Sequence, residues 1–149
     1  KEVSRKHFTS LYGDDFPVNE LREKRFDYIY EALKNNQVDY KKGANELIEY
    51  LINNNYKIAL VSSSPAGLIN EYINHLDLLK HFKVIISGDD IIKGKPHPEP
   101  FLKACKKLSS KPKNCLVLED SKNGVIAGKN AKMKTVFIED YVKVDSIIK

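Results

Sequence analysis

The sequence has no tryptophan, one methionine and only two cysteines among its 149 residues. Cys105 and Cys115 lack the paired spacing of a zinc site, so we expect both to be reduced residues of the core. No apolar run approaches the roughly 18 residues of a membrane-spanning helix, and no secretory signal is present. These absences predict a cytoplasmic protein without a membrane partner.

Blocks of like charge are also missing. The 25 lysines and arginines are interleaved with 20 aspartates and glutamates, which leaves a formal net charge of +5. We interpret this pattern as an ordinary solvated surface; the alternative is a positive bias that helps to attract an anionic partner. Neither an aromatic-basic motif nor zinc spacing accompanies the charge, so the sequence gives no support to a nucleic-acid partner. We expect a monomer or a weak dimer.

Short apolar runs alternate with helical patterns over most of the chain. Hydrophobic residues make up 42% of the sequence, enough for a core. This alternation favours an α/β fold with a parallel sheet and right-handed crossovers, a Rossmann-like three-layer arrangement. The expected strands are 57–61, 83–86, 115–118 and 134–138, and the expected helices between them are 66–80, 98–108 and 121–132.

The N-terminal part has a different pattern. Residues 3–12 and 19–35 have helical spacing, and no strand pattern precedes residue 57. We therefore predict a partial helical subdomain over residues 1–38, joined to an α/β core over residues 39–149. A further helix, 44–54, leads into the first strand.

Polar residues collect after the apolar strands. Ser62 follows the first strand, Lys95 lies in the loop after the second, and Glu119 and Asp120 follow the third. In an open parallel sheet, ligands bind outside the carboxyl ends of the strands. A hydroxyl, an ammonium group and a carboxylate pair on one rim therefore predict a site that handles phosphate and a metal.

Each of these groups has a direct use with a phosphate. Ser62 precedes a helix N-terminus, where its hydroxyl and nearby amides can bind anionic oxygens. Lys95, between Gly94 and Pro96, can neutralise charge that develops during phosphoryl transfer. Asp120 is a hard oxygen ligand suited to Mg²⁺, and Glu119 can assist through water or by orienting the other ligands.

Simpler interpretations exist for each motif taken alone. Ser64 and Pro65 can cap the next helix, Lys95-Pro96 can be an ordinary loop, and residues 119–121 can be a helix start. We interpret Asp89 and Asp90 as turn residues. The combination and order of the three motifs favour a functional site over these separate explanations.

The three motifs resemble those of a known family. Residues 57–64 (KIALVSSS), 94–101 (GKPHPEPF) and 118–124 (LEDSKNG) are similar to the second, third and fourth motifs of the haloacid dehalogenase superfamily. The resemblance is to its phosphatases and phosphomutases that carry a helical cap, including β-phosphoglucomutase. It covers roughly residues 40–140 and implies that the α/β part is the core of such an enzyme.

The resemblance implies roles for individual residues. Ser62 would bind the transferring phosphate with help from the Ser63 backbone, and Lys95 would stabilise the phosphate and the nucleophile. Asp120 would bind Mg²⁺ with assistance from Glu119. Residues 3–5 are similar to a cap segment whose arginine contacts the substrate's second phosphate. By that similarity Arg5, together with Ser64, is expected to bind substrate.

Two departures from the family pattern shape the functional prediction. The first motif, an Asp-x-Asp after an apolar strand, is absent, and Asp14-Asp15 is no substitute because no strand precedes it. The resemblance thus implies that a core strand carrying the nucleophile, with the first part of the cap, lies upstream of Lys1. A lysine that follows the second motif in β-phosphoglucomutases is replaced by Pro65 and Ala66.

The functional prediction is therefore a Mg²⁺-dependent phosphatase. It would act on a small sugar phosphate through an aspartyl-phosphate intermediate, and residues 1–149 alone would be inactive. A phosphomutase, or a phosphate-binding α/β domain without catalysis, are the alternatives.

Overall fold

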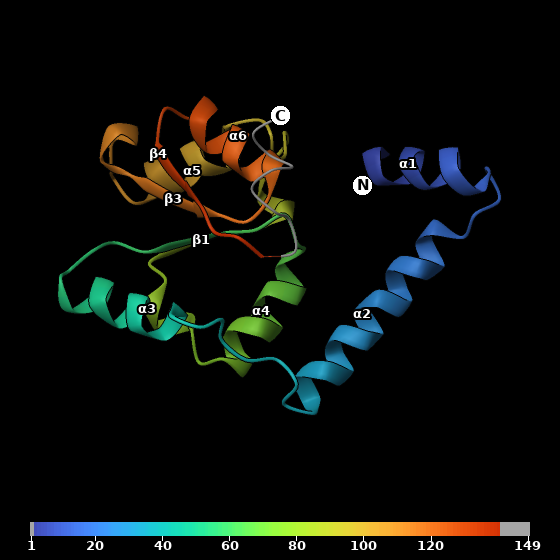
Figure 1. Cartoon of the computed structure of the whole chain (residues 1–149), viewed down its shortest axis with the longest axis horizontal. Coiled ribbons are helices and arrows are strands. Elements are labelled where there is room, and N and C mark those ends of the chain that lie inside the picture. Colours follow the sequence, from blue (N-terminus) through green and yellow to red (C-terminus); the bar gives the residue numbers. More distant parts are fainter. Residues whose placement is uncertain (1, 141–149) are drawn as a thin grey trace. The chain divides into compact units, whose positions relative to one another are not determined.

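A computed structural model describes residues 2–140 of the chain (Figure 1). Within that range, none of the helices combines the length and apolar character needed to cross a membrane. The principal elements, in chain order, are α1 (Glu2–Tyr12), α2 (Val18–Lys34), α3 (Ala44–Asn53), β1 (Ala59–Val61), α4 (Ala66–His75), β2 (Val84–Ile86), α5 (Glu99–Lys107), β3 (Leu116–Glu119), α6 (Lys122–Asn130) and β4 (Lys134–Phe137).

The chain divides into two compact units, with the boundary between Asp39 and Tyr40. The N-terminal unit contains α1 and α2, which are joined by a turn at Gly13. The φ angle of Gly13 is +93°, a conformation that favours glycine. Beside this turn the ring of Phe16 stacks on Tyr12, at 4.8 Å between centroids, and on Phe8, at 5.7 Å. These aromatic contacts stabilise the junction between the two helices.

The C-terminal unit, called the core unit below, contains two pairs of parallel strands. Ala59 of β1 lies opposite Val84 of β2, and Leu116 of β3 lies opposite Lys134 of β4. Parallel neighbours need a crossover connection, which α4 supplies for the first pair and α6 for the second. The predicted α/β fold is thus confirmed.

The strands do not form the single sheet that the sequence pattern predicted. Among residues 2–140, β1 pairs with β2 alone and β3 pairs with β4 alone, so two separate ladders result. α5 packs on β1 and β2, α6 packs on β3 and β4, and the two helices contact each other. Helix packing, rather than a continuous hydrogen-bond ladder, therefore joins the two strand pairs.

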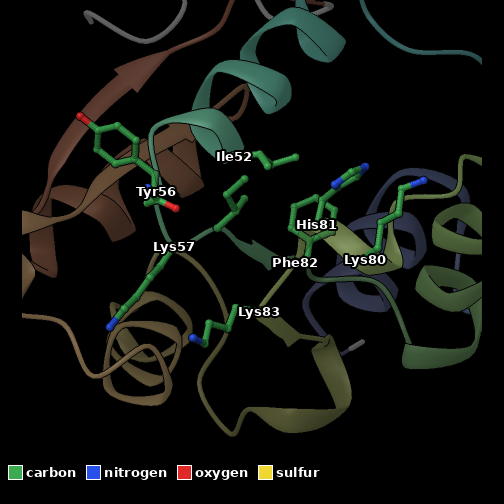
Figure 2. A pocket seen from close by; sticks show the side chains of 9 residues that line it. Ile52, Tyr56, Lys57, Lys80, His81, Phe82 and Lys83 are labelled. Carbon is green, nitrogen blue, oxygen red and sulfur yellow. The ribbon is translucent and has the colours of Figure 1, made fainter.

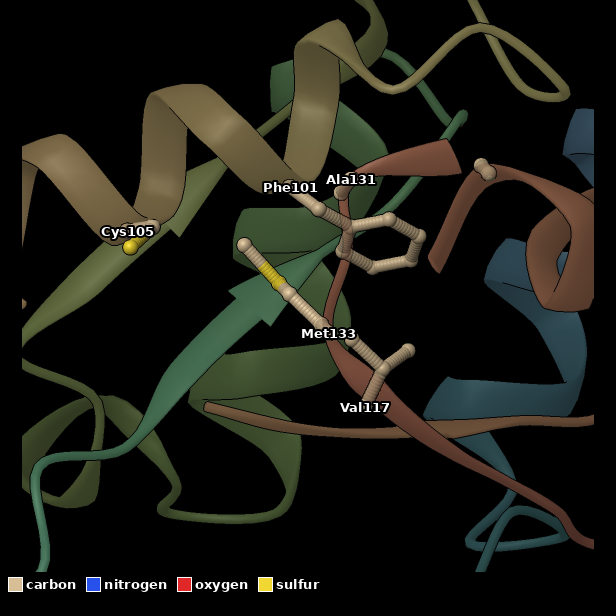
Figure 3. Close-up of a cluster of buried hydrophobic side chains, with 6 residues drawn as sticks. Phe101, Cys105, Val117, Ala131 and Met133 are labelled. Atoms are coloured by element: carbon tan, nitrogen blue, oxygen red, sulfur yellow. The ribbon is translucent and has the colours of Figure 1, made fainter. Parts of the chain in front are cut away.

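The hydrophobic core lies between these helices and strands (Figure 3). Val61 of β1 packs against a cluster contributed mainly by α5, β3 and the approach to β4, and this contact links the two strand pairs. A smaller cluster joins β2 to α5. The buried members of the larger cluster are Phe101, Cys105, Val117, Ala127, Ala131 and Met133, and those of the smaller are Val84, Ile86 and Ala104.

α4 is shorter than predicted. The helical spacing of apolar residues continues to residue 80, yet α4 ends at His75. Asp77 adopts a φ of +50°, which an α-helix cannot contain, and a 3₁₀ turn over Leu79–His81 follows. Leu79, the apolar residue of this turn, continues the apolar spacing without extending the helix. The other predicted elements begin and end within two residues of the observed ones.

Two contacts hold the start of the core unit. Lys41, directly after the unit boundary, forms an ion pair with Asp140. The neighbouring Tyr40 donates a hydrogen bond from its hydroxyl to the Leu76 carbonyl at 2.6 Å. The chain then turns into α3 at Gly43, whose φ is +84°. These contacts attach the start of the core unit to its body.

Candidate active site

A cavity of about 480 Å³ opens at the carboxyl ends of β1 and β3. It lies where the sequence predicted a site, beyond the strand tips of a parallel α/β arrangement. Ser62, Ser63, Ser64, Lys95, Glu119 and Asp120 all line it, so the three sequence motifs meet in one place. The remaining lining residues are Lys41, Leu60, Val61, Leu118, Ser121 and Ile138.

The serine loop after β1 is held by the loop after β2. The Ser62 amide donates to the Ile86 carbonyl at 2.9 Å and so extends the β1–β2 ladder. The Ser62 hydroxyl accepts a hydrogen bond from the Ser64 amide at 3.1 Å. The Gly88 amide donates to the Ser64 carbonyl at 2.8 Å, and a side chain at Gly88 would collide with the Ser63 carbonyl. Glycine is therefore required at this approach.

The first residue of α4 has an unexpected cap. A carboxylate oxygen of Asp89 accepts a hydrogen bond from the Ala66 amide at 2.8 Å. The sequence interpretation treated Asp89 and Asp90 as turn residues, and both also accept hydrogen bonds. The Ser87 hydroxyl and amide donate to the Asp90 carboxylate, and they hold its pKa below the ordinary value. This turn therefore helps to fix the serine loop.

Lys95 reaches across from the loop after β2 to both strand tips. Its ammonium donates to the Val61 carbonyl of β1 at 3.2 Å and forms an ion pair with Glu119 of β3. The same ammonium lies 5.0 Å from the centroid of the Phe101 ring. The side chains of the ion pair are only 12% and 7% exposed for Lys95 and Glu119, respectively. A single buried ammonium thus connects β1 and β3.

The loop that carries Lys95 is fixed at both ends. Before Lys95, the two carboxylate oxygens of Glu99 accept hydrogen bonds from the Ile92 and Lys93 amides, at 2.7 and 3.0 Å. These bonds keep the pKa of Glu99 below its usual value. After Lys95, the Asn130 side-chain amide donates to the Pro96 carbonyl at 3.2 Å. Anchors from α5 and α6 therefore set the course of this loop.

Glu119 is buried and occupied on both oxygens. Oε1 pairs with Lys95, and Oε2 accepts hydrogen bonds from the Ser121 hydroxyl at 2.9 Å and the Ser121 amide at 3.3 Å. α6 passes so close that a Cβ at Gly124 would overlap the Glu119 carboxylate. The side chain is thus positioned to hold Lys95 and the start of α6.

Asp120 differs from its neighbour. It is exposed and lines the cavity, and within residues 2–140 no hydrogen bond or ion pair is recorded for its carboxylate. Over the same range, no three His, Cys, Asp or Glu side chains converge in a metal-holding group. Asp120 is therefore a carboxylate available to a ligand, and further metal ligands would have to come from other donors.

Arg5 and Lys41 differ in their relation to the cavity. Arg5 lies on α1, in the N-terminal unit, and is exposed. Lys41 also lines the cavity, paired with Asp140, and sequence reasoning missed it. No motif surrounds Lys41, and its approach to the cavity depends on how the chain enters the core unit.

Comparison with known proteins identifies the family. The chain matches the haloacid dehalogenase-like hydrolases over residues 3–138. It is 41% identical over 102 residues to a bifunctional riboflavin kinase/FMN phosphatase of Arabidopsis thaliana, covering 68% of this chain and 27% of that protein. It is 35% identical over 117 residues to a phosphorylated carbohydrates phosphatase of Thermotoga maritima, covering 78% of this chain and 52% of that protein.

Solved structures give the same result. A crystal structure of β-phosphoglucomutase from Clostridium difficile matches with a TM-score of 0.75 and 28% identity, over 93% of this chain and 64% of that one. The chain spans about half or less of the length of the curated relatives named above. The predicted resemblance is confirmed: the chain belongs to the haloacid dehalogenase-like hydrolases.

Proposed function

We propose that the complete protein is a Mg²⁺-dependent phosphatase of small phosphorylated compounds, with sugar phosphates as the substrate class. The observation that carries this proposal is the buried Lys95 ammonium between the tips of β1 and β3, beside the free Asp120 carboxylate. A cation and an available carboxylate in one cavity suit a phosphoryl group with its metal. The relatives that are named phosphatases support the same activity.

The residues of the cavity would have different roles in catalysis. The Ser62 hydroxyl and the Ser63 amide would bind the phosphoryl oxygens, because they lie before the N-terminal end of α4, where the neighbouring Ser62 and Ser64 amides are already hydrogen-bonded within the protein. Lys95 would neutralise the charge that develops on those oxygens as the ester bond breaks. Glu119 would keep the Lys95 ammonium in place through their ion pair.

The donor set also suits Mg²⁺. This ion binds proteins through one or two carboxylates and keeps several waters, so the single free carboxylate of Asp120 is a sufficient anchor. When bound, the ion would stabilise negative charge on the phosphoryl oxygens. Glu119 would not bind the ion directly, since Lys95 and Ser121 already occupy its oxygens; it would hold these two residues in position.

The nucleophile would come from a further strand. Neither cavity carboxylate suits this role, because Glu119 is engaged and Asp120 is assigned to the metal. Among residues 2–140, β1 and β3 each have one unpaired edge, and both strands border the cavity. The free edges of β1 and β3 present backbone N–H and C=O groups that a further strand can pair with. A strand between β1 and β3 would use both edges and present an aspartate at the same rim.

That aspartate would attack phosphorus and release the dephosphorylated sugar, and water would then cleave the aspartyl-phosphate. Residues 1–149 would bind and orient the phosphate but lack this group. The absence of an Asp-x-Asp motif after a strand in this sequence supports the assignment.

The test measures phosphate release by the complete protein from a panel of sugar phosphates and from p-nitrophenyl phosphate. We expect turnover with Mg²⁺ and none in excess EDTA. Asp120→Asn and Lys95→Met should each lower kcat/KM at least about 100-fold, as expected when charge stabilisation is removed. Asp27→Asn and Lys113→Met replace exposed residues of the same types outside the cavity and should retain activity.

Three outcomes would oppose the proposal. Full activity in EDTA would exclude a requirement for Mg²⁺. Unchanged activity of Asp120→Asn would exclude Asp120 as the metal ligand. Interconversion of sugar phosphate isomers without net phosphate release would identify a mutase instead. A protein that binds phosphate but turns over no substrate would be the non-catalytic alternative.

A further inference from the structure

A second pocket, here called the basal pocket, lies at the opposite ends of β1 and β2 (Figure 2). Its volume is about 410 Å³, within the range of small-molecule sites. The residues that line it precede the two strands or end α3, whereas the candidate active site follows the strands. They are Ile52, Asn55, Tyr56, Lys57, Ile58, Lys80, His81, Phe82 and Lys83.

The basal pocket is strongly basic. Three lysines and a histidine are among its lining residues, and no aspartate or glutamate is. The loop segments 54–58 and 78–83, which contain most of its lining residues, hold no acidic residue, nor does segment 108–115; Asp77, directly before the second segment, is the nearest acid in the sequence. On a chain that interleaves 25 basic with 20 acidic residues, this separation of charge is local and specific. It produces a positive potential that favours an anionic ligand.

The three lysines are not equally available. Lys80 is paired with Asp77. Lys57 donates to the Leu108 carbonyl at 2.7 Å, a contact that holds its ammonium in place without neutralising the charge. Lys83 is exposed, and among residues 2–140 no hydrogen bond or ion pair is recorded for its ammonium. Lys57 and Lys83 therefore supply two uncompensated positive charges.

The pocket also has an apolar part. Figure 2 shows the side chains of Ile52 and Phe82 between the Lys57–Lys83 side of the pocket and the Lys80–His81 side. Ile52 is 39% exposed. A flat apolar group placed against Phe82 and Ile52 would remove this surface from water. The pocket thus offers an apolar surface and two cations.

We infer that the basal pocket binds a small organic phosphate with a planar body, of the nucleoside monophosphate class. The phosphate would lie between Lys57 and Lys83, and the planar body would cover Phe82 and Ile52. The site is separate from the candidate active site, because it lies before β1 and β2 rather than after them. Its ligand is therefore distinct from the proposed substrate, and the inference does not depend on phosphatase activity.

The test is calorimetric titration of the complete protein with AMP, without Mg²⁺ and at low ionic strength. We expect AMP to bind with a sub-millimolar dissociation constant, and adenosine and inorganic phosphate each to bind at least about tenfold more weakly. Lys57→Gln and Lys83→Gln should each weaken AMP binding about tenfold, the effect of one charge-assisted hydrogen bond. Lys129→Gln, which replaces an exposed lysine that lines neither pocket, should change binding less than twofold.

The location is tested with Lys95→Met, which alters the candidate active site alone. AMP affinity within twofold of the unmodified protein supports the basal pocket, whereas loss of binding in this variant assigns AMP to the active site and overturns the inference. It is also overturned if AMP fails to bind, if Lys57→Gln and Lys83→Gln bind AMP normally, or if phosphate alone binds as tightly as AMP. If long oligonucleotides bind but AMP does not, the lysines form a surface for polyanions and the inference is overturned. Circular dichroism checks that the variants, all at exposed lysines apart from Lys95→Met, remain folded.

Discussion

Gly124→Ala should destabilise the protein although alanine is the better helix former. A methyl group at residue 124 would overlap the Glu119 carboxylate, which is buried and pairs with Lys95. Moving that carboxylate breaks a buried ion pair, at a cost of about 3–5 kcal/mol. Helix propensity returns about 1 kcal/mol. The free energy of unfolding should therefore fall by about 2–4 kcal/mol.

Gly67→Ala is the matched control. Gly67 lies in the first turn of α4, and a Cβ there would meet no atom within 4 Å. The same substitution should therefore stabilise the protein, by about 0.4–1 kcal/mol, through the entropy of the unfolded chain. Opposite signs for the two substitutions would show that contact with Glu119, rather than helix propensity, decides the outcome.

Urea unfolding of the complete protein measures both effects, provided that the slope with denaturant is unchanged. A double-mutant cycle isolates the contact. In a Glu119→Ala background the obstacle is gone, so Gly124→Ala should stabilise the protein by about 1 kcal/mol through helix propensity, and the coupling free energy should be about 3–5 kcal/mol. A single Gly124→Ala variant as stable as the unmodified protein would refute this account of the Lys95–Glu119 pair.

Three further predictions concern the loops and thiols. Glu99→Gln retains one acceptor oxygen but loses one of two amide contacts, so the loop before Lys95 should loosen and kcat/KM of the complete enzyme should fall about 2- to 10-fold, measured beside its unfolding free energy. Cys115, whose burial and contact with Cys105 raise its pKa to about 11, should react slowly with iodoacetamide at pH 8 and faster as the pH approaches 11, followed by mass spectrometry. Because the pKa of Asp90 is lowered in the folded state, its stabilising contribution is present above its ordinary value of 3.8 and should be lost as the pH falls through the folded value; Asp90→Asn should reduce this acid sensitivity in unfolding titrations between pH 2 and 6.

The sequence predicted the location of the candidate site because strand order alone determines it. Ser62, Lys95 and Asp120 each follow an apolar strand, and parallel strands bring their carboxyl ends to one edge. The roles of these residues remain a proposal. The sequence could not predict that Lys95 pairs with Glu119, because that contact depends on how far a flexible side chain reaches between two strand tips.

Other details escaped the sequence because they depend on tertiary contacts. Asp89 caps α4 from a loop 23 residues away, and no local pattern announces such a bond. The apolar spacing past His75 predicted a longer α4, because Leu76 and Leu79 continue the helical spacing although the helix has already ended; Leu79 lies in a 3₁₀ turn and is exposed. Hydrophobic periodicity likewise indicates where strands lie but not which strand edges pair, so the two ladders among residues 2–140 could not be read from it.

The ion pair between Lys41 and Asp140 has a topological consequence for the core unit. Because it brings the point of entry next to Asp140, the described part of the core unit, residues 40–140, begins and ends at neighbouring positions. A short linker can bridge two positions this close, as in circular permutation, and the chain can then be opened at an exposed loop elsewhere. Replacing the segment before Tyr40 likewise leaves the connections among β1, β2, β3 and β4 intact.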